Sequence, residues 1–393
     1  DIYNEECEKK LLLQSDLLGI LKGYGYHPIQ TPTFEFFDIF GKEIGTTPSK
    51  ELYKFFDREG NTLVLRPDMT PSIARAAAKY FMDEDMPIRL CYMGNTFINN
   101  SSYQGRLKER AETGAELIGD DSEDADAEMI AMVIDSLRQA GLKKASVKGH
   151  LEEEVEEELN QYIENKNYFA VEGLLKTQPV DEGLKKVFLK LPELFGSLGQ
   201  MQEAKKLTAN PGALAAIERL EKVHSILESR GLEAYVSYDL GMLSRYQYYT
   251  GIIFKAYTYG TGDYIVTGGR YDKLLVQFGK DTPAVGFVIV VDQLMAALSR
   301  QQIDVPVTLV NTVILYETSA RSRALWLGSY FRDKGLAVQS MKKKEQVALE
   351  DYKAMAIQRG MRNVLYLKGD GTVVTAMDTV NGNTDQIPIT AYE

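Results

Sequence analysis

The stretch RLCYMGNTFINNSSYQGRLKERAETGAELIG, residues 89–119, decides the fold of this chain. One strand is predicted from Ile88 to Phe97 and a second from Arg110 to Ile118, with a polar loop between them. A second stretch, TGGRYDKLLVQFGKDTPAVGFVIVVDQL, covers residues 267–294. Within and just after it, Ala284 to Ser299 predicts an apolar strand and then a helix. The core of the protein therefore draws on segments that lie far apart in the sequence.

The region before these stretches predicts a mixture of helices and strands. Leucine spacing indicates a helix over residues 2–25, and Asp121 to Ala140 has the pattern of an amphipathic helix. Alternating residues from Ile29 to Phe40 predict a strand broken at Pro32, and residues 52–67 predict a hairpin that turns at Glu59-Gly60-Asn61. A further helix is predicted from Pro71 to about Met82, with Thr70 as its N-cap.

The composition changes twice further along the chain. Residues 151–231 contain few β-branched residues and have helical patterning, so we expect a helical insertion there, after which strands resume at Ala234. A linker near Gln301 to Pro306 precedes residues 307–393, where strand and helix patterns alternate. We therefore expect a core over residues 1–300 and a small C-terminal α/β domain over residues 307–393.

Composition and charge restrict the function. The 393 residues include only two cysteines, Cys7 and Cys91, and three histidines, so neither a disulfide framework nor a structural metal site is expected. The chain has no long apolar run and no apolar segment near its start, and we expect a cytoplasmic protein. The net charge of −11 argues against tRNA binding, because phosphate approach requires a basic surface, and the run Lys342 to Lys344 is typical of a solvated helix face or loop.

Four motifs in order resemble histidyl-tRNA synthetases over roughly residues 5–300. They are the segment around Pro32, LRPDMTPSIAR at residues 65–75, SRYQYYTGIIFKAY at residues 244–257, and the stretch at residues 267–294, which contains both GGRYD and TPAVGF. The stretch at residues 89–119 resembles the same family. The resemblance implies an α+β fold with the antiparallel sheet of class II aminoacyl-tRNA synthetases, flanked by helices. Residues 307–393 occupy the place of an anticodon-binding domain, and Pro32 implies dimerisation.

The chain departs from that family at residues that handle ATP. In place of arginines it has Ile98, Ser244 and Gln293, and Asn100 replaces a glutamate that helps to hold adenine. A lost donor to reacting phosphates typically costs about 2.7–4 kcal/mol of transition-state stabilisation. We therefore predict no catalytic residues and no cofactor. Arg106 and Lys108 remain either as solvated loop charges or as a residual anion site.

The amino-acid pocket is better preserved, and the resemblance implies that it binds histidine. The residues expected in it are Asp68, Thr70, Glu112, Glu116, Tyr248 and Tyr249. Glu116 would face the imidazole, whereas Glu112 replaces a glutamine that would contact the amino group. A structural alternative stays open, in which the two tyrosines only pack and Glu116 pairs with a neighbouring cation.

The pair Gly268-Gly269 and the following Arg270, Tyr271 and Asp272 predict a tight strand-to-helix transition, where glycine permits left-handed conformations or close backbone approach. We interpret this motif as structural. The sequence has no G-x-x-x-x-G-K-[ST] phosphate loop that would support a nucleotide site.

A histidyl-tRNA synthetase frame without these arginines resembles the regulatory subunits of short-form ATP phosphoribosyltransferase, which opens histidine biosynthesis. The resemblance implies a non-catalytic chain that activates a separate catalytic subunit in a hetero-octamer, four plus four, and makes it sensitive to L-histidine. Two alternatives remain at this point: a divergent histidyl-tRNA synthetase, and a synthetase-like paralogue that serves another partner.

Overall fold

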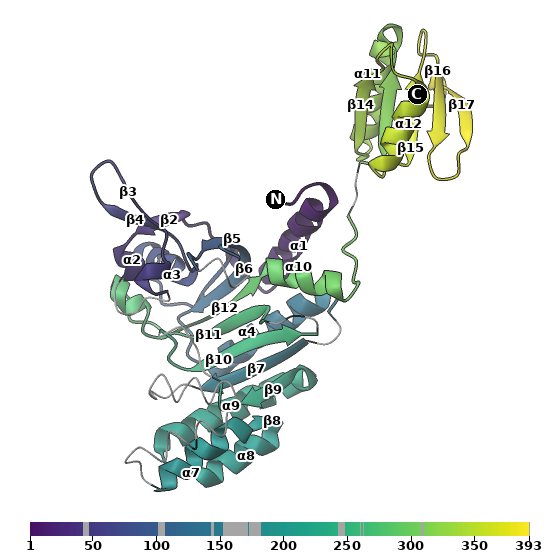
Figure 1. Ribbon diagram of the computed structural model, residues 1–393. Coiled ribbons are helices and arrows are strands. Elements are labelled where there is room, and N and C mark those ends of the chain that lie inside the picture. Colours follow the sequence, from purple (N-terminus) through teal and green to yellow (C-terminus); the bar gives the residue numbers. More distant parts are fainter. Residues whose placement is uncertain are drawn as a thin grey trace. The chain divides into compact units, whose positions relative to one another are not determined.

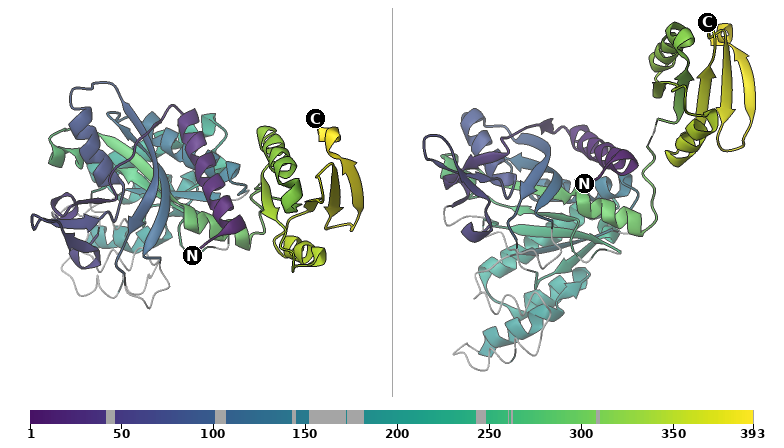
Figure 2. Two further views of the ribbon diagram at one scale, coloured as in Figure 1. Left: turned by 90° about the horizontal axis from the view of Figure 1, so that it is seen from above. Right: turned by 45° about the horizontal axis from the view of Figure 1, so that its top comes forward.

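The computed structural model describes residues 1–41, 47–100, 107–142, 145–151, 172, 182–242, 248–259, 261, 263–307 and 310–392. The chain divides into two compact units, Asp1–Val305 and Pro306–Glu393, each with its own core (Figures 1 and 2). In the described residues, no helix has the length and apolar character needed to span a membrane.

A long mixed sheet forms the centre of the first unit. Its described strands lie in the order β1 (His27–Pro28), β5 (Ile88–Phe97), β6 (Glu109–Ile118), β12 (Ala284–Val290), β11 (Val266–Arg270), β10 (Ile252–Thr258), β7 (Ala145–Leu151), β9 (Val236–Asp239) and β8 (Phe195–Gly196). Neighbours from β5 to β7 run antiparallel, whereas β1 with β5 and β7 with β9 run parallel. The predicted strands at residues 88–97 and 110–118 are confirmed, and the α+β class with them.

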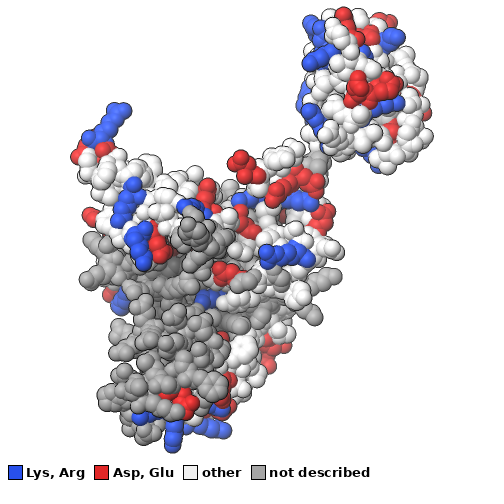
Figure 3. All heavy atoms as spheres, viewed as in Figure 1, with Lys and Arg blue, Asp and Glu red and all other residues white. Residues whose placement is uncertain are grey.

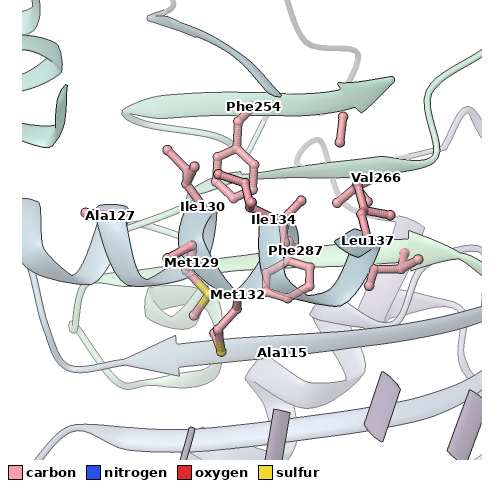
Figure 4. Close-up of a cluster of buried hydrophobic side chains, with 14 of the residues drawn as sticks. Ala115, Ala127, Met129, Ile130, Met132, Ile134, Leu137, Phe254, Val266 and Phe287 are labelled. Atoms are coloured by element: carbon pink, nitrogen blue, oxygen red, sulfur yellow. The ribbon is translucent and has the colours of Figure 1, made fainter. Parts of the chain in front are cut away.

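Helices cover one face of this sheet. They are α1 (Asn4–Gly23), α4 (Glu123–Gln139) and α10 (Val291–Arg300), and they share a buried apolar cluster with the strands. Figure 4 shows Ile130 and Ile134 of α4 on the side of Phe254. The Ser122 hydroxyl accepts from the Ala125 amide and so caps α4, which explains where this helix begins.

The opposite face carries a second cluster, which includes residues of α3 (Thr70–Tyr80). Beside it lies a small sheet in the order β2 (Phe34–Phe36), β4 (Thr62–Leu65) and β3 (Lys54–Phe56), together with α2 (Asp38–Gly41). Because side chains alternate along a strand, β6 sends Ala111, Ala115 and Leu117 into the helix-covered cluster and Glu112 and Glu116 to this face.

Three further helices lie in the later part of the first unit: α7 (Glu182–Lys190), α8 (Leu198–Leu207) and α9 (Pro211–Ser229). Asn210 caps α9 by accepting from the amides of Gly212 and Ala213, and Pro211 begins the helix. α9 packs along α4 through the ion pair between Lys222 and Glu123. The acidic run at residues 152–158 lies outside the described residues.

The second unit has a five-stranded sheet in its described part. The order is β14 (Val338–Lys342), β13 (Thr312–Tyr316), β15 (Asn363–Leu367), β16 (Val373–Asp378) and β17 (Thr384–Pro388). Helices α11 (Arg321–Asp333) and α12 (Leu349–Gln358) pack into separate clusters, with Ile314 on one face of β13 and Val313 and Leu315 on the other. Strands and helices alternate from β13 to β15, as the sequence patterns over residues 307–393 predict.

Short 3-10 helices complete the described elements, at Ser49–Glu51, Leu191–Glu193, Glu233–Tyr235, Leu275–Phe278, Thr318–Ala320 and Ile389–Tyr392.

Three local predictions were wrong. The segment from Ile29 to Phe40 is a strand only at Phe34–Phe36 and then turns into α2. Thr70 lies inside α3 and does not cap it, because its hydroxyl donates to a distant carboxylate. Gly268 and Gly269 lie within β11 with no left-handed backbone, and a Cβ on Gly268 would lie 2.5 Å from the Phe254 ring, so close packing alone accounts for that glycine.

Candidate functional site

The candidate site lies on the face of the sheet that α4 does not cover. β6 places Glu112 and Glu116 on this face, where they are 7% and 1% exposed. Asp68, which precedes α3, adds a third carboxyl group and is partly buried. Buried carboxyl groups are uncommon without a cationic partner, so this group needs an explanation.

Hydroxyl groups surround the Glu116 carboxylate. It accepts from Thr70 Oγ1 at 2.9 Å and Tyr92 OH at 3.4 Å through one oxygen, and from Tyr271 OH at 2.5 Å through the other. Across the ladder, Glu116 pairs with Gly286, where an added Cβ would lie only 1.6 Å from Glu116 Oε2. Glycine at 286 is therefore what makes room for this carboxylate.

Asp68 connects α3 to the tyrosine pair. One carboxylate oxygen accepts from the Thr70 amide at 3.0 Å, and the other accepts from Tyr248 OH at 2.9 Å. The Tyr248 ring packs edge-on against the rings of Tyr249 and Tyr271, with centroids 4.9 and 5.8 Å away. These contacts fix an aromatic wall beside the carboxyl groups.

Glu112 lies at the other end of the group and accepts from Thr96 Oγ1 at 2.8 Å. Its partner across the ladder is Gly94, and a Cβ added there would lie 2.5 Å from Arg66 Nη2. The Arg66 guanidinium donates to the carbonyl oxygens of Asn95, Thr31 and Pro32 at 2.8–3.1 Å. Arg66 is thus anchored to backbone oxygens close to Glu112.

Burial dominates the electrostatics of the site. It raises the pKa of Glu116 to about 8, and burial together with the Asp68 charge raises the pKa of Glu112 to about 8. Burial also raises the pKa of Asp68 above its usual value and that of Tyr271 well above its own. The tyrosine therefore remains a donor at neutral pH, and the carboxyl groups favour a cationic ligand.

The six predicted pocket residues come together in the structure. Thr70 joins Asp68 to Glu116, Tyr248 joins Asp68 to Tyr249, and the Asp68 charge acts on Glu112. In the structural alternative, Glu116 pairs with a neighbouring cation. None of the described ion pairs includes Glu116. Sequence reasoning did not find Tyr92 and Thr96, whose only signal is that alternation along β5 places them opposite β6, and it interpreted Tyr271 as structural.

Three of the positions that depart from the synthetase motifs belong to the described residues. Ile98 follows β5, where its amide donates to the Lys108 carbonyl at 2.9 Å. Asn100 donates to the Leu107 carbonyl, and Gln293 lies in the first turn of α10. Ser244 and Arg106 lie outside the described residues.

The GGRYD motif has a second, separate contact. Arg270 is buried and donates twice to the Asp126 carboxylate, at 2.7 and 2.9 Å, and Arg219 donates to the other oxygen of the same carboxylate at 2.7 Å. This Asp126 cluster fixes α4 and α9 to the end of β11, in agreement with a structural role for the motif. Within the described ranges, no set of His, Cys, Asp or Glu side chains is arranged to hold a metal ion.

Comparison with known proteins identifies the family of the chain. The sequence model of the histidyl-tRNA synthetase family matches residues 1–294. Proteins named ATP phosphoribosyltransferase regulatory subunit from Acetivibrio thermocellus and Ruminiclostridium cellulolyticum are 35% and 36% identical, over 97% and 98% of this chain and 92% and 94% of theirs.

Solved structures agree with these sequence matches. A crystal structure from Bacillus halodurans described as an ATP phosphoribosyltransferase regulatory subunit/histidyl-tRNA synthetase is 30% identical, covers 94% of this chain and 96% of its own, and superimposes with a TM-score of 0.83. The apo histidyl-tRNA synthetase of S. aureus shares the fold at 19% identity, with 100% and 96% coverage and a TM-score of 0.70. The chain belongs to the family of ATP phosphoribosyltransferase regulatory subunits, which has the histidyl-tRNA synthetase fold.

Proposed function

We propose that this chain is the non-catalytic regulatory subunit of a two-component ATP phosphoribosyltransferase and that it senses L-histidine at the site around Glu116. The observation that carries the proposal is a buried group of carboxyl and hydroxyl side chains in a chain whose relatives bear the name of that subunit. Free histidine carries an ammonium group and an imidazole, both of which can donate to carboxylates. Isothermal titration calorimetry with L-histidine tests the proposal.

The proposed ligand fits the chemistry of the described residues. Glu116, at the buried end of the group, would receive the imidazole N–H, and the tyrosines 248 and 249 would line the ring. An analogue without a ring N–H would leave the buried carboxyl group without that partner, so the site would discriminate against it.

The chain would not activate amino acids. Amino-acid activation requires positive charge preorganised against the reacting phosphates, and Ile98, Ser244 and Gln293 cannot supply it. Pyrophosphate exchange with histidine and ATP should stay at background. Robust exchange would instead favour the alternative, a divergent histidyl-tRNA synthetase, to which the family match also points.

The partner would be a separate catalytic chain, in a hetero-octamer of four regulatory and four catalytic subunits. Histidine would bind two assembly states with different affinity and so shift the catalytic chains between them. Purification from native cells should recover a small phosphoribosyltransferase together with this chain. Recovery of the chain alone, under conditions that preserve complexes, would argue for a paralogue with another function.

On its own the chain would form a homodimer through the Pro32 region. The small sheet next to it exposes aromatic side chains, with Phe34, Phe36 and Phe56 at 50%, 56% and 72% exposure. An isologous contact would cover this surface twice, once on each subunit. Light scattering should give twice the chain mass of 44.1 kDa, and a monomer at micromolar concentration would contradict this part of the proposal.

The C-terminal unit would not bind tRNA, in spite of its likeness in position to an anticodon-binding domain. Residues 306–393 contain 11 Lys and Arg against 9 Asp and Glu, so the net charge of the unit is only +2, although that of the whole chain is −11. Lys and Arg side chains are interspersed with Asp and Glu over the described surface in Figure 3. A tRNA-binding surface is expected to show a continuous basic area instead.

A further inference from the structure

The amino-acid ligand of the proposed function carries a carboxylate, which the carboxyl groups of the site cannot bind. The positions where the synthetase motifs have arginine hold Ile98, Ser244 and Gln293, which carry no positive charge. A carboxylate that leaves water for a buried site needs a cation or several hydrogen-bond donors. The positive group for the ligand carboxylate must therefore come from elsewhere in the chain.

Arg66 is a buried guanidinium with donors to spare. The residue is only 5% exposed. Its Nε donates to the Asn95 carbonyl at 2.8 Å, and its Nη1 donates to the carbonyls of Thr31 and Pro32 at 2.9 and 3.1 Å. Its Nη2 makes no hydrogen bond among the described contacts. Because a buried donor without an acceptor is costly, Nη2 is the place where an anionic ligand has most to contribute.

Gly94 of β5 shows which way Arg66 Nη2 points. Leu90 and Tyr92 belong to the cluster on the site face of the sheet, and alternation along the strand places Gly94 on that face as well. A Cβ on Gly94 would lie 2.5 Å from Arg66 Nη2, so this nitrogen fills the space in front of the glycine. Gly94 lies opposite Glu112 in the ladder. The free edge of the guanidinium therefore faces the site next to Glu112, although no ion pair joins the two groups in the described structure.

Arg110 adds a second positive charge at this end of the site. It lies two residues before Glu112 on β6, so its side chain leaves the same face of the sheet about 7 Å away along the strand. Its side chain is partly exposed and has no hydrogen bond or ion pair among the described contacts. Burial raises the pKa of Glu112, and the charges of Arg110 and Arg66 oppose that rise, so both guanidinium groups act on this region. Beyond Glu112 the site is therefore positive.

We propose that Arg66 binds the carboxylate of the amino-acid ligand through its free Nη2 and that Arg110 supplies a second positive charge at the same end of the site. The proposal rests on the proposed function, because it takes the ligand to be an α-amino acid with an imidazole side chain. The two arginines would then make the site select the zwitterionic amino acid over the corresponding amine or alcohol, which lacks the carboxylate.

The first test compares two ligands on the wild-type full chain by isothermal titration calorimetry. L-Histidinol keeps the imidazole and the ammonium group of L-histidine but has a hydroxymethyl group in place of the carboxylate. Loss of a charge-assisted hydrogen bond should weaken its binding by about 10- to 150-fold relative to L-histidine. Equal affinities would overturn the inference and leave the proposed function intact, whereas absence of histidine binding would overturn both.

Two variants locate the cation that makes this distinction. Arg66→Gln should bring the ratio of the histidinol and histidine dissociation constants close to one, and Arg110→Gln should reduce it by a smaller factor. The ratio is the informative quantity, because damage to the fold weakens both ligands alike, whereas a lost contact with the carboxylate weakens only histidine. Arg110→Gln removes a side chain without described partners, so this variant is expected to fold even if Arg66→Gln does not.

Arg89→Gln is the matched control. Arg89 also lies on β5, but it pairs with Glu128 of α4, which accepts from Tyr26 as well, on the helix-covered side of the sheet. The control should keep the wild-type ratio. A wild-type ratio in both Arg66→Gln and Arg110→Gln would overturn the inference. If Arg66→Gln does not fold, a wild-type ratio in Arg110→Gln would overturn it in the same way.

Discussion

Two buried carboxylate groups belong to the same unit and are satisfied in opposite ways. Asp126 on α4 accepts from Arg270 and Arg219, so its charge has two cationic partners within the chain. Glu116 on β6 is equally buried but accepts only from hydroxyl groups among the described contacts. The first cluster is complete without a ligand, whereas the second lacks a positive charge.

The difference separates a structural role from a binding role. A buried charge whose partner belongs to the chain holds elements together, and its removal weakens folding. A buried carboxyl group without a cation makes the folded state less stable at a pH where the group ionises. A ligand that brings the missing positive charge therefore stabilises such a group more than one that already has a cationic partner. Substitutions in the two clusters should therefore have opposite effects on stability and on binding.

The largest effect is expected for Asp126→Asn. Two guanidinium groups lose their shared carboxylate, and one of them, Arg270, is 3% exposed. Breaking a buried pair typically costs about 3–5 kcal/mol of folding free energy. Urea unfolding of the variant and the wild type measures the loss. A loss below about 1 kcal/mol, the range of an exposed pair, would show that the cluster is not structural.

Glu116→Gln should weaken histidine binding by about 1.5–3 kcal/mol, because it removes a charge-assisted hydrogen bond while it preserves the shape. The ligand-free variant should be at least as stable as the wild type at pH 8, because it no longer ionises a buried group. Calorimetry and urea unfolding give the two quantities. A variant that binds histidine normally but unfolds readily would place Glu116 with Asp126 as a structural residue.

Gly286→Ala tests the geometry that accommodates Glu116. The added Cβ would lie 1.6 Å from Glu116 Oε2, so the carboxylate must move. Overpacking of this kind typically costs about 1–3 kcal/mol of stability, and histidine affinity should fall as well. Gly19→Ala in α1 is the matched control, because its Cβ would meet nothing within 4 Å. Unchanged histidine affinity in Gly286→Ala would mean that the position of this carboxylate does not matter for binding.

The smallest effect is expected in the pH dependence of stability. Glu112 and Glu116 have folded-state pKa values near 8, above the ordinary value of 4.5, so the folded state binds more protons than the unfolded state between these limits. The stability of the ligand-free protein should fall as pH rises through this window. Glu112→Gln should reduce the slope by at most about one proton per molecule. Melting temperatures from pH 5 to 8 measure this, and an unchanged slope would contradict the protonated state of Glu112.

The sequence predicted the sheet better than the site. Alternation fixed β5 and β6 almost to the residue, because one face is apolar and a shift by one residue would reverse every side chain. It could not place the Thr70 hydroxyl on Glu116, since that bond joins residues 46 positions apart. The hydroxyl groups of Tyr92 and Tyr271 were missed for the same reason: tyrosine in a strand looks like core until the cross-strand neighbour is known.

The glycines illustrate the same limit. For Gly268 and Gly269 the motif predicted a strand-to-helix transition that needs either a left-handed backbone or a close approach. Both glycines lie in β11 under aromatic rings, so only the close approach applies. The TPAVGF motif did not indicate a role for Gly286, although this glycine faces the Glu116 carboxylate. Glycine needed for close approach cannot be told from glycine needed for a turn without the neighbouring strands.

The central claim is that this chain confers histidine control on a catalytic partner through the carboxylate site. The most direct measurement is the ATP phosphoribosyltransferase activity of a catalytic subunit from the same organism, assembled with the wild-type chain, Glu116→Gln or Glu128→Gln and titrated with L-histidine. We predict that activity requires the regulatory chain and that Glu116→Gln raises the histidine concentration for half-inhibition by about 10- to 150-fold. Glu128→Gln should leave it unchanged. Half-inhibition at the same histidine concentration in all three complexes would contradict the claim, since the sensor would then lie elsewhere.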